Sequence, residues 1–344
     1  MPSDQQVPSK FSGYAALQKG LEVSKYEYEP GPLQPRDIDI RVTHNGLCHT
    51  DIHMTLDDWG VSKFPFIPGH EVVGYVAAKG SEVRHLEVGD RVGYAWIKDS
   101  CHGCQNCYTG HENLCLKGYT GLITGGGMGG WQNYMRAPAY FAFKIPDGLD
   151  SVSAAPLLCA GVTVYAPLKR LITKPGTRVS VIGIGGLGHL ALQFAAALGA
   201  EVTAISTSPD KEAEARKFGA TNFVVGEEGC KAISGTQDVV INTVSSKNDY
   251  EAQMALLRPD GTLCIVGLPV DKITVGVLDV VFNQKKICGS IVGGRSDMAE
   301  MLQFAAIKGI KPQCETMPLS QVNEAVQKVL ANKARYRIVL VNDS

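Results

Sequence analysis

The sequence predicts an α/β protein with two parts: a β-rich unit, expected to form a partly open barrel, and a parallel sheet covered with helices. Up to about residue 150, short alternating or apolar runs such as DIDIRVTH (37–44) are broken by Gly, Pro and Asp, which is typical of strands and turns. From residue 174 onward, apolar strand-like runs alternate with helical stretches. With 344 residues, 44% of them hydrophobic, the chain is long enough for two domains.

The elements of the second part follow in a regular order. An apolar strand at 178–182 runs into a glycine turn and a helix. Further strands are expected at EVTAIST (201–207), QDVVINTV (237–244), TLCIVGL (262–268) and KKICGSIVG (285–293), with DYEAQMALLRPDG (249–261) interpreted as helical. The tail predicts two helices, at 297–309 and 319–334, and a last strand at 337–341. In the first part, TGGGMGGW (124–131) has no helix pattern after it, so it predicts a mobile loop rather than a phosphate cradle.

Charge and composition point to a small-molecule partner. The formal net charge is -1 and no Lys/Arg run reaches five residues, so neither nucleic acid nor an anionic membrane surface is an expected partner. The N-terminal stretch lacks a basic segment followed by an apolar one, and no apolar run approaches membrane-spanning length. We therefore expect a soluble cytoplasmic protein.

Ten cysteines in such a chain favour metal binding or chemistry over a disulfide framework. Cys230, Cys264, Cys288 and Cys314 sit singly inside apolar runs, where a free thiol behaves as a small hydrophobe. We expect these four to be core residues, and look for chemistry among the other six.

The turn after the strand at 178–182 predicts a dinucleotide site. Gly183 permits the tight turn, Gly185 lets the backbone approach a pyrophosphate, and Gly188 lets the helix pack closely on the strand. The start of that helix offers free N–H groups to the anion. Because a strand precedes this motif and a second strand follows about twenty residues on, we predict a Rossmann domain.

The end of the second strand favours NADP over NAD. An NAD site usually carries Asp or Glu here to bind the ribose hydroxyls, whereas this chain has Ser206, Thr207 and Ser208, with Lys211 beyond. Small hydroxyls and a cation suit a 2′-phosphate. Ser208 with Pro209 could also simply begin the next helix, and the two interpretations are compatible.

Four cysteines predict a closed metal site. Cys101, Cys104, Cys107 and Cys115 are separated by two, two and seven residues on a loop with two glycines. Four soft thiolates suit a tetrahedral structural zinc. The competing interpretation is an iron–sulfur cluster, whose bacterial ferredoxin pattern has a shorter last spacer and a following proline.

A second set of ligand types is dispersed along the chain. Cys48, His70 and Cys159 would leave a bound zinc one open position, which is the arrangement of a catalytic zinc. Each residue could equally be a packed core residue, because the three lie far apart in sequence. Spacing alone leaves the two interpretations even.

The order of the motifs resembles the zinc-dependent medium-chain alcohol dehydrogenases. GLCHTDIH (46–53), PGHE (68–71), the four-cysteine loop, LLCAGVTVYAPL (157–168) and GIGGLGHLA (183–191) carry the resemblance across nearly the whole chain. CHTDIH, LLCAGVTVY and STSPDK (206–211) look most like the cinnamyl alcohol dehydrogenase group. The implied fold is a GroES-like catalytic domain at 1–155 and 295–344, interrupted by a Rossmann domain at 156–294.

The resemblance also implies site residues and two zinc ions per chain. Cys48, His70 and Cys159 would hold the catalytic zinc, Glu71 would be an alternative ligand, and Asp51 would orient His70. Thr50 would hold the substrate hydroxyl and His53 would end a proton path through the nicotinamide ribose. The implied cofactor-binding residues are Thr50, Thr163, Gly183, Ile184, Gly185, Gly186, Leu187, Gly188, Ser206, Thr207, Ser208, Lys211, Thr243, Gly267, Ser290, Ile291 and Val292.

The predicted function is hydride transfer between NADP(H) and primary alcohols or aldehydes, aromatic or of medium length. Met54, Trp59, Trp96 and Ile291, expected around the pocket, vary within the group, and Gly125–Gly130 would leave the nearby loop open. Two alternatives are a double-bond or quinone reductase of the same fold and a non-catalytic cofactor-binding protein. The resemblance also suggests a homodimer, with edge strands paired near TVGVLDVVF (274–282).

Overall fold

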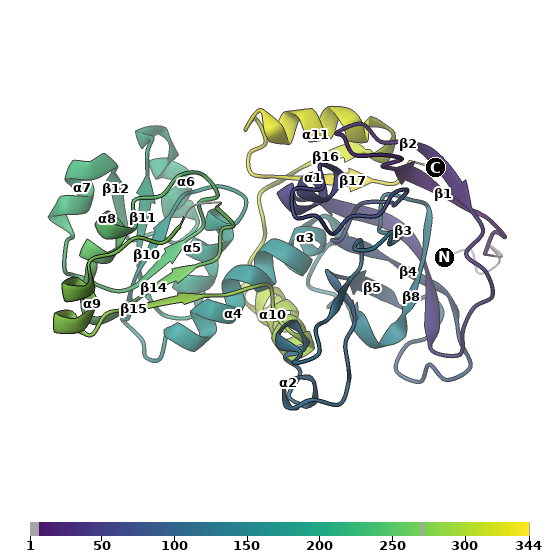
Figure 1. Cartoon of the computed structure of the whole chain (residues 1–344), viewed down its shortest axis with the longest axis horizontal. Helices are drawn as coiled ribbons and strands as arrows, with labels where there is room; N and C mark the ends of the chain where they lie inside the picture. The colour runs from purple at the N-terminus through teal and green to yellow at the C-terminus, as the bar shows by residue number, and fades with distance from the viewer. Residues whose placement is uncertain (1–6, 270–271, 344) are drawn as a thin grey trace. The chain divides into compact units, whose positions relative to one another are not determined.

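The computed structural model describes residues 7–269 and 272–343. The chain divides into two compact units (Figure 1). The first contains the residues up to Cys159 and from Gly293 onward, and the second contains Ala160–Val292. The sequence placed these boundaries at 155/156 and 294/295.

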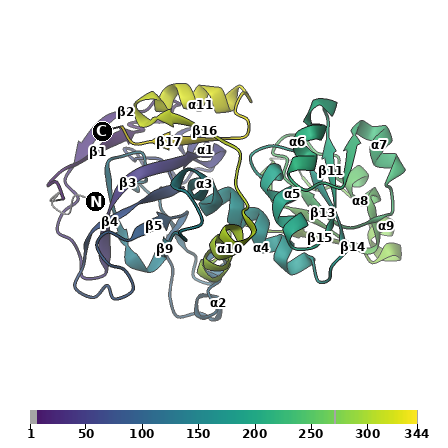
Figure 2. The ribbon, with the colours of Figure 1, turned by 180° about the vertical axis from the view of Figure 1, so that it is seen from behind.

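The first unit is built on a seven-stranded sheet that includes the end of the chain. Its path is β16-β17-β3-β4-β5-β9, and β8 pairs with β3. The strands are β3 (Asp37–Leu47), β4 (Val72–Lys79), β5 (Arg91–Tyr94), β8 (Tyr134–Pro138), β9 (Ala142–Lys144), β16 (Cys314–Pro318) and β17 (Arg337–Val341). The last strand, β17, runs antiparallel to β3 with Ile338 opposite Leu47, so the chain returns to the unit in which it began (Figure 2).

Smaller elements complete this unit. They are β1 (Phe11–Ala15), β2 (Ser24–Tyr28), β6 (Ile97–Asp99), β7 (Thr120–Gly121), α1 (His49–Thr55), α2 (Gln105–Tyr108), η1 (Glu112–Leu114), η2 (Ala139–Phe141), α3 (Ser151–Pro156), α10 (Arg295–Lys308), η5 (Leu319–Gln321) and α11 (Val322–Leu330). Ile38 and Ile40 of β3, with Phe11 and Trp131, are fully buried and belong to the core of this unit.

The second unit is a six-stranded parallel sheet of order β12-β11-β10-β13-β14-β15. Its strands are β10 (Arg178–Ile182), β11 (Glu201–Ser206), β12 (Asn222–Val225), β13 (Gln237–Asn242), β14 (Leu257–Ile265) and β15 (Lys286–Gly289). Counted from β10, the order is 3-2-1-4-5-6, which is that of the Rossmann fold, and the predicted fold class is confirmed. The strand order reverses between β10 and β13, and the carboxyl ends of the strands at this point form the usual cofactor crevice.

Helices follow the strands of this sheet. They are α4 (Val162–Leu171), α5 (Gly188–Ala197), η4 (Pro209–Lys211), α6 (Glu212–Lys217), α7 (Gly226–Ala232), α8 (Tyr250–Ala255) and α9 (Val277–Asn283). A π-helix, η3 (Leu157–Gly161), joins α3 to α4. The whole helical stretch Ser151–Leu171 is apolar and long enough to cross a membrane, but 89% of its most apolar window is buried inside the protein, as in a core helix.

Two predicted elements of the second unit were wrong. TVGVLDVVF was expected to provide an edge strand, but residues 277–283 form helix α9, and the edge of the sheet is β15. The helix predicted at 249–261 ends at Ala255, because Leu257 onward pairs with β13 as part of β14. Pro259 and the left-handed Asp260 (φ 66°) are incompatible with a continued helix.

The glycine-rich loop and the isolated cysteines also differ from expectation. Only Gly125 and Gly126 of the loop have room for a side chain; a Cβ on Gly127 would lie 1.9 Å from the Leu122 carbonyl oxygen, and Gly129 and Gly130 are packed as closely. The predicted openness is therefore wrong for Gly127–Gly130. Of the four cysteines predicted to be core, Cys264 is buried and the other three are half-buried.

Candidate metal and cofactor sites

The dispersed ligands Cys48, His70, Glu71 and Cys159 come together in the first unit. One ligand atom from each lies within 4.8 Å of every other. Cys48 directly follows β3 and His70–Glu71 directly precedes β4, and these strands pair antiparallel, with the Gly46 N–H donating to the Glu71 carbonyl oxygen at 2.9 Å. Cys159 enters from the π-helix Leu157–Gly161, and such helices recur at functional sites.

Two buried atoms of these four residues that lack a hydrogen-bond partner indicate that the residues fit a metal ion. Asp51 is fully buried and its carboxylate accepts from His70 Nδ1 at 2.8 Å, from the Gly69 N–H at 2.9 Å and from the Cys48 N–H at 3.1 Å. Because Nδ1 donates to Asp51, Nε2 is the ring nitrogen of His70 that is left to bind a metal, and it offers a lone pair once its proton is displaced. Among the described residues, His70 Nε2 and Glu71 Oε2 are buried and have no hydrogen-bond partner.

The electrostatics of the cluster favour a bound cation. The hydrogen bond with Cys159 holds the pKa of Cys48 well below its usual range, and the same bond raises the pKa of Cys159. Burial raises the pKa of Glu71 to about 7, although Arg337 opposes the rise. Two sulfurs, an imidazole nitrogen and a nearby carboxylate, with Arg337 as the only cation that the described residues pair with them, form the donor set that zinc prefers.

Arg337 is a residue of this site that the sequence analysis missed. It begins β17, is 7% exposed, and hydrogen-bonds to Oε1 of the fully buried Glu71. The pairing of β17 with β3 delivers it to the cluster from 266 residues away. The signal in the sequence is a single arginine at the start of an otherwise apolar strand. Such a strand is expected to be buried, and a buried arginine requires an acidic partner.

The predicted proton-path residues lie on α1, and the structure adds Asp58 to them. Thr50 and His53 are three residues apart and therefore share one face of the helix. His53 Nδ1 lies 2.7 Å from Asp58 Oδ2, and the Trp59 ring lies 5.2 Å from the imidazole ring. The helix ends in a Schellman turn, in which left-handed Asp57 donates to the Met54 carbonyl and Asp58 donates to the His53 carbonyl. This turn places the Asp58 side chain beside His53.

The expected pocket residues are not equivalent. The Trp96 ring meets the edge of the His70 ring, with 5.4 Å between centroids, and Trp59 is 40% exposed beside His53. Ile291 is also 40% exposed, in the second unit. Met54 is 1% exposed and packs in the core of the first unit.

The four-cysteine loop folds into a second cluster. Its four sulfurs all lie within 4.8 Å of one another, with Cys107 3.5 Å from Cys104 and 3.9 Å from Cys101. Hydrogen bonds from the main chain at Leu116 and Cys107 lower the pKa of Cys104 to about 6, while burial raises that of Cys107 to about 11. Main-chain N–H groups directed at sulfur stabilise thiolates, as a zinc ligand set requires.

A half-buried ion pair between Glu112 and Arg295 links this loop to α10. Glu112 is fully buried, and its carboxylate accepts from Arg295 Nε at 2.7 Å and from the Arg295 main-chain N–H at 2.9 Å. The guanidinium carbon lies 3.5 Å from the Tyr140 ring centroid. A Cβ on Gly294 would lie 2.0 Å from the Gly110 carbonyl oxygen, so the two backbones touch. These contacts hold the loop against the start of α10.

The glycine turn lies between β10 and α5, as predicted. Gly183 has φ +87°, a Cβ on Gly188 would lie 1.8 Å from the Gly183 carbonyl oxygen, and a Cβ on Gly185 would meet nothing within 4 Å. Gly183 thus permits the turn, Gly188 permits the close packing of the helix, and Gly185 leaves the backbone open to a ligand. Ile184, Gly186 and Leu187 complete the turn, and the Thr243 hydroxyl donates to the carbonyl oxygens of Ile182 and Gly183 at 2.9 and 3.1 Å.

The serine-rich segment lies directly after β11. Ser206 is 7% exposed and its hydroxyl accepts from the Ser208 N–H at 3.1 Å, Thr207 is exposed, and Lys211 Nζ donates to the Ile184 carbonyl oxygen at 2.9 Å. Lys211 therefore reaches the glycine turn. Ser208 also precedes the short helix η4 and Pro209 is its first residue, so the expected positions are confirmed, although the Ser208 side chain makes no capping hydrogen bond.

The other predicted cofactor residues lie elsewhere in the second unit. Thr163 is buried in the first turn of α4, and Gly267 follows β14. The Ser290 hydroxyl accepts from Arg170 at 3.1 Å, and Val292 has the rare φ of +38°.

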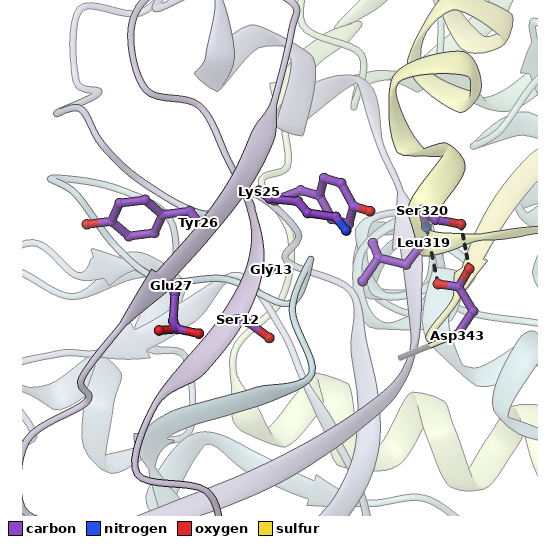
Figure 3. A pocket seen from close by; sticks show the side chains of 9 residues that line it. Ser12, Gly13, Lys25, Tyr26, Glu27, Leu319, Ser320 and Asp343 are labelled. Carbon is purple, nitrogen blue, oxygen red and sulfur yellow. Dashed lines mark hydrogen bonds between the residues drawn. The ribbon is translucent and has the colours of Figure 1, made fainter.

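A cavity of about 420 Å³ in the first unit is separate from these sites (Figure 3). It lies between β1, β2 and the C-terminal segment, where Asp343 accepts hydrogen bonds from Ser320, and none of the predicted site residues lines it. Mixed charges from Lys25, Glu27 and Asp343 give it no single ligand chemistry.

Comparison with known proteins identifies the family. Residues 34–147 match the model of the alcohol dehydrogenase GroES-like domain, and residues 186–306 match that of zinc-binding dehydrogenases. The chain is 42% identical to a probable formaldehyde dehydrogenase of Bacillus subtilis over 319 residues, covering 90% of both chains. It is 39% identical to an aldehyde reductase of Synechocystis over 329 residues, covering 95% of this chain and 97% of the other.

Solved structures agree with this assignment. A cinnamyl alcohol dehydrogenase of Sorghum bicolor superposes with a TM-score of 0.91 at 35% identity, covering 96% of this chain and 97% of the other. A cinnamyl alcohol dehydrogenase of Helicobacter pylori in complex with NADP(H) superposes with a TM-score of 0.89 at 29% identity, covering 97% and 99%. This chain belongs to the zinc-dependent medium-chain alcohol dehydrogenases, in the cinnamyl alcohol dehydrogenase-like group, and combines a GroES-like catalytic domain with a nicotinamide-binding Rossmann domain.

Proposed function

We propose that this protein is an NADP-dependent aldehyde reductase and alcohol dehydrogenase with two zinc ions per chain. The observation that carries the proposal is the buried, unpartnered Nε2 atom of His70, which is oriented by Asp51 toward a cluster with two thiols. Cys48, His70 and Cys159 would hold the catalytic zinc, with Glu71 as an alternative ligand, and the four-cysteine loop would hold the structural one.

Each protein group has a distinct task in the proposed chemistry. When bound, zinc would supply a Lewis acid for the alcohol or aldehyde oxygen, and the nicotinamide would supply or accept the hydride. Asp51 fixes the tautomer of His70. Thr50 would hold the substrate hydroxyl, and His53, at the end of a path through the nicotinamide ribose, would take up the proton during oxidation or supply one during reduction. Asp58 holds the Nδ1 side of His53 and balances the charge of the protonated ring.

The cofactor preference rests on Ser206 to Lys211. No acid occupies the end of β11, and Lys211 reaches the glycine turn. The NADP(H) complex of the Helicobacter protein and the name of an NADP-dependent alcohol dehydrogenase of Mycolicibacterium smegmatis, 37% identical, support the same choice. We expect Lys211→Ala to raise the KM for NADPH about tenfold and that for NADH little, since only NADPH carries the 2′-phosphate. Lys217→Ala, on the next helix, is the matched control.

The substrate proposal rests on aromatic side chains beside the ligands. Trp96 meets His70, and Trp59 meets His53, so apolar ring surface adjoins both the metal ligands and the proton path. Two relatives, 38% and 37% identical, are named for cinnamyl alcohol and 8-hydroxygeraniol. Both alcohols are larger than ethanol, the alcohol that acetaldehyde gives on reduction. We expect cinnamaldehyde, benzaldehyde and hexanal to be reduced with higher kcat/KM than acetaldehyde. A preference for acetaldehyde would exclude this substrate class.

One experiment tests the central proposal. Zinc content is measured by mass for the wild type, for Cys159→Ser and for Cys104→Ser, together with NADPH oxidation on cinnamaldehyde. We expect two zinc ions in the wild type and one in each variant, with turnover lost in Cys159→Ser. Cys230→Ser, which alters a cysteine outside both clusters, is expected to keep both ions and full turnover. A wild type with one zinc and no turnover would refute the catalytic assignment.

We also propose a homodimer formed through α9 and the edge strand β15. Val277, Leu278, Val281 and Phe282 are all more than half exposed on one short helix, which directly precedes β15, the last strand of the sheet among the described residues. Contiguous apolar surface and open strand edges are typical of subunit contacts.

A further inference from the structure

Three amide side chains form a closed ring at the carboxyl end of β13. Asn242 Nδ2 donates to Asn248 Oδ1 at 2.8 Å and to Gln253 Oε1 at 2.9 Å, and Gln253 Nε2 donates to Asn248 Oδ1 at 2.9 Å. Asn242 is fully buried and Gln253 is 7% exposed. Buried amides that satisfy one another in this way define a rigid structure, because any displacement leaves polar groups unpaired.

The ring fixes the loop that joins β13 to α8. Asn242 Oδ1 accepts from the Val244 N–H at 2.9 Å, and Asn248 Nδ2 donates to the Ser246 carbonyl oxygen at 2.7 Å. The main-chain oxygen of Asn242 also accepts from the N–H groups of Val266 and Gly267, at 3.0 and 3.2 Å. Asn242 thereby links the turn after β13 to the turn after β14.

The Thr243–Val244 segment is wedged between two glycines. A Cβ on Gly183 would lie 2.9 Å from Val244 Cγ2 and 3.1 Å from Thr243 Oγ1, and one on Gly267 would lie 2.4 Å from the Val244 carbonyl oxygen. Gly183 opens the predicted pyrophosphate turn, and the strands β10, β13 and β14 are neighbours in the sheet. A shift of Val244 would therefore be transmitted to the turns on both sides of it.

We propose that Asn242, Asn248 and Gln253 are positioning residues for the nicotinamide cofactor, which keep the turns after β10, β13 and β14 at the spacing that cofactor binding requires. This inference rests on the proposed cofactor site and adds residues that act through Val244. The amides are uncharged, so their contribution is to geometry.

The strand itself offers a matched control. Gln237 lies at the amino end of β13, whereas Asn242 lies at its carboxyl end. Gln237 is 4% exposed, and its side chain accepts from the Ser180 hydroxyl and donates to the Thr236 hydroxyl. Gln237→Met and Gln253→Met each replace a buried amide with an apolar chain of similar length. Both variants are expected to lose stability, but only Gln253→Met loosens the loop at the cofactor edge.

The test is titration of the zinc-loaded enzyme with NADPH, followed by its fluorescence, with urea unfolding of each variant. We expect Gln253→Met to raise the Kd for NADPH about tenfold, which is the lower end of the effect that supporting contacts have on metal ligands, with kcat at saturating NADPH within about twofold. Gln237→Met should leave the Kd within about twofold of the wild type at a similar loss of stability. Asn248→Ala, on the half-buried loop, should reproduce the Gln253→Met result and serves if that variant does not fold.

The possible outcomes distinguish failure of the positioning role from failure of the cofactor site. Equal Kd values for the wild type, Gln253→Met and Asn248→Ala, or an equal rise in Gln237→Met, would overturn the positioning role while leaving the cofactor site intact. A wild type that binds neither NADPH nor NADH would overturn the proposed cofactor site and this inference with it.

Discussion

At the scale of single residues, the buried pair of Glu71 and Arg337 should be critical for stability. The two side chains are 0% and 7% exposed, and removing one leaves an uncompensated charge. We expect Arg337→Met to reduce the free energy of unfolding by about 3–5 kcal/mol. The double variant Glu71→Gln/Arg337→Met should recover most of this loss because no charge remains unpaired. Urea unfolding of the zinc-loaded protein measures both effects, and a double variant as unstable as the single one would contradict the explanation.

Asp150 should contribute stability that depends on pH. Its carboxylate caps α3 by accepting from the Ser153 N–H at 2.7 Å, and it pairs with Lys311 at 3.0 Å. Partial burial raises the pKa of Asp150, but the bonds from Ser153 and Lys311 outweigh this and lower it to about 2. A carboxyl with a lowered pKa stabilises the fold above its unfolded pKa of about 3.9, and the contribution disappears as the pH falls toward about 2.

We therefore expect Asp150→Ala to lower the free energy of unfolding by about 1 kcal/mol at pH 7, as for other N-caps. The difference from the wild type should persist to about pH 4 and shrink below it. Thermal unfolding at several pH values measures it, with the exposed Asp147→Ala as control. A difference that is larger at pH 3 than at pH 7 would show that capping is not the cause.

The site residues that could be predicted were cysteines and a histidine, which are uncommon residue types and stand at spacings typical of metal sites. Four cysteines on one loop indicate a metal by themselves, and Cys48, His70 and Cys159 became specific only through the resemblance of their surrounding motifs. Arg337 and Asp58 escaped prediction for physical reasons. The first reaches the cluster through a strand pairing across most of the chain, and the second depends on a left-handed Asp57 that no local pattern required.

At the scale of elements, two glycines of the β10–α5 turn should respond differently to the same substitution. Gly188→Ala places a Cβ against the Gly183 carbonyl oxygen, whereas Gly185→Ala meets no atom of the protein. We expect Gly188→Ala to destabilise the Rossmann unit by about 1–3 kcal/mol. Gly185→Ala should leave stability within about 0.5 kcal/mol but raise the Kd for NADPH at least about tenfold, since the new methyl group occupies the approach of the pyrophosphate.

Unfolding and NADPH titration of the two variants measure these effects side by side. Normal NADPH affinity in Gly185→Ala would place the pyrophosphate elsewhere. A fully stable Gly188→Ala would mean that the helix can move away from the strand without cost.

Helices and strands were predicted well where the spacing of apolar residues agreed with the Gly, Pro and capping residues at the ends of the element. They were predicted poorly where a high content of β-branched residues suggested a strand against both signals. TVGVLDVVF is rich in valine and was interpreted as an edge strand. It forms α9 because tertiary contacts hold a helix there: Lys285 donates to Asp279 Oδ1 at 2.9 Å and to the Met254 carbonyl oxygen at 2.8 Å, and left-handed Gln284 ends the helix. Such long-range anchors override local propensity.

At the scale of the whole molecule, the two-part architecture could be predicted because the change from alternating strands to strand–helix repeats is visible along the chain. The six-stranded parallel order follows from right-handed crossovers and the glycine fingerprint. The seven-stranded sheet could not be predicted in the same way, because β16 and β17 join it from the far end of the chain. Only the resemblance carried that information.

The exposed face of α9 makes a prediction about assembly. Phe282 is 79% exposed and Leu278 is 68% exposed, and neither contributes to the core of its own unit. If a second copy covers this face, a charge there must be buried against apolar side chains, and the dimer should dissociate. We expect sedimentation equilibrium to give twice the 36.9 kDa chain mass for the wild type and the chain mass itself for Phe282→Glu.

Tyr108→Glu is the matched control, because Tyr108 is 78% exposed on the four-cysteine loop, remote in sequence from α9. It should remain dimeric, so that a change confined to Phe282→Glu identifies the face and not merely an added charge. A monomeric wild type would leave α9 as an uncovered apolar surface that needs another partner. A dimer that survives Phe282→Glu would move the subunit contact away from this helix, because a carboxylate cannot be buried there without a counter-charge.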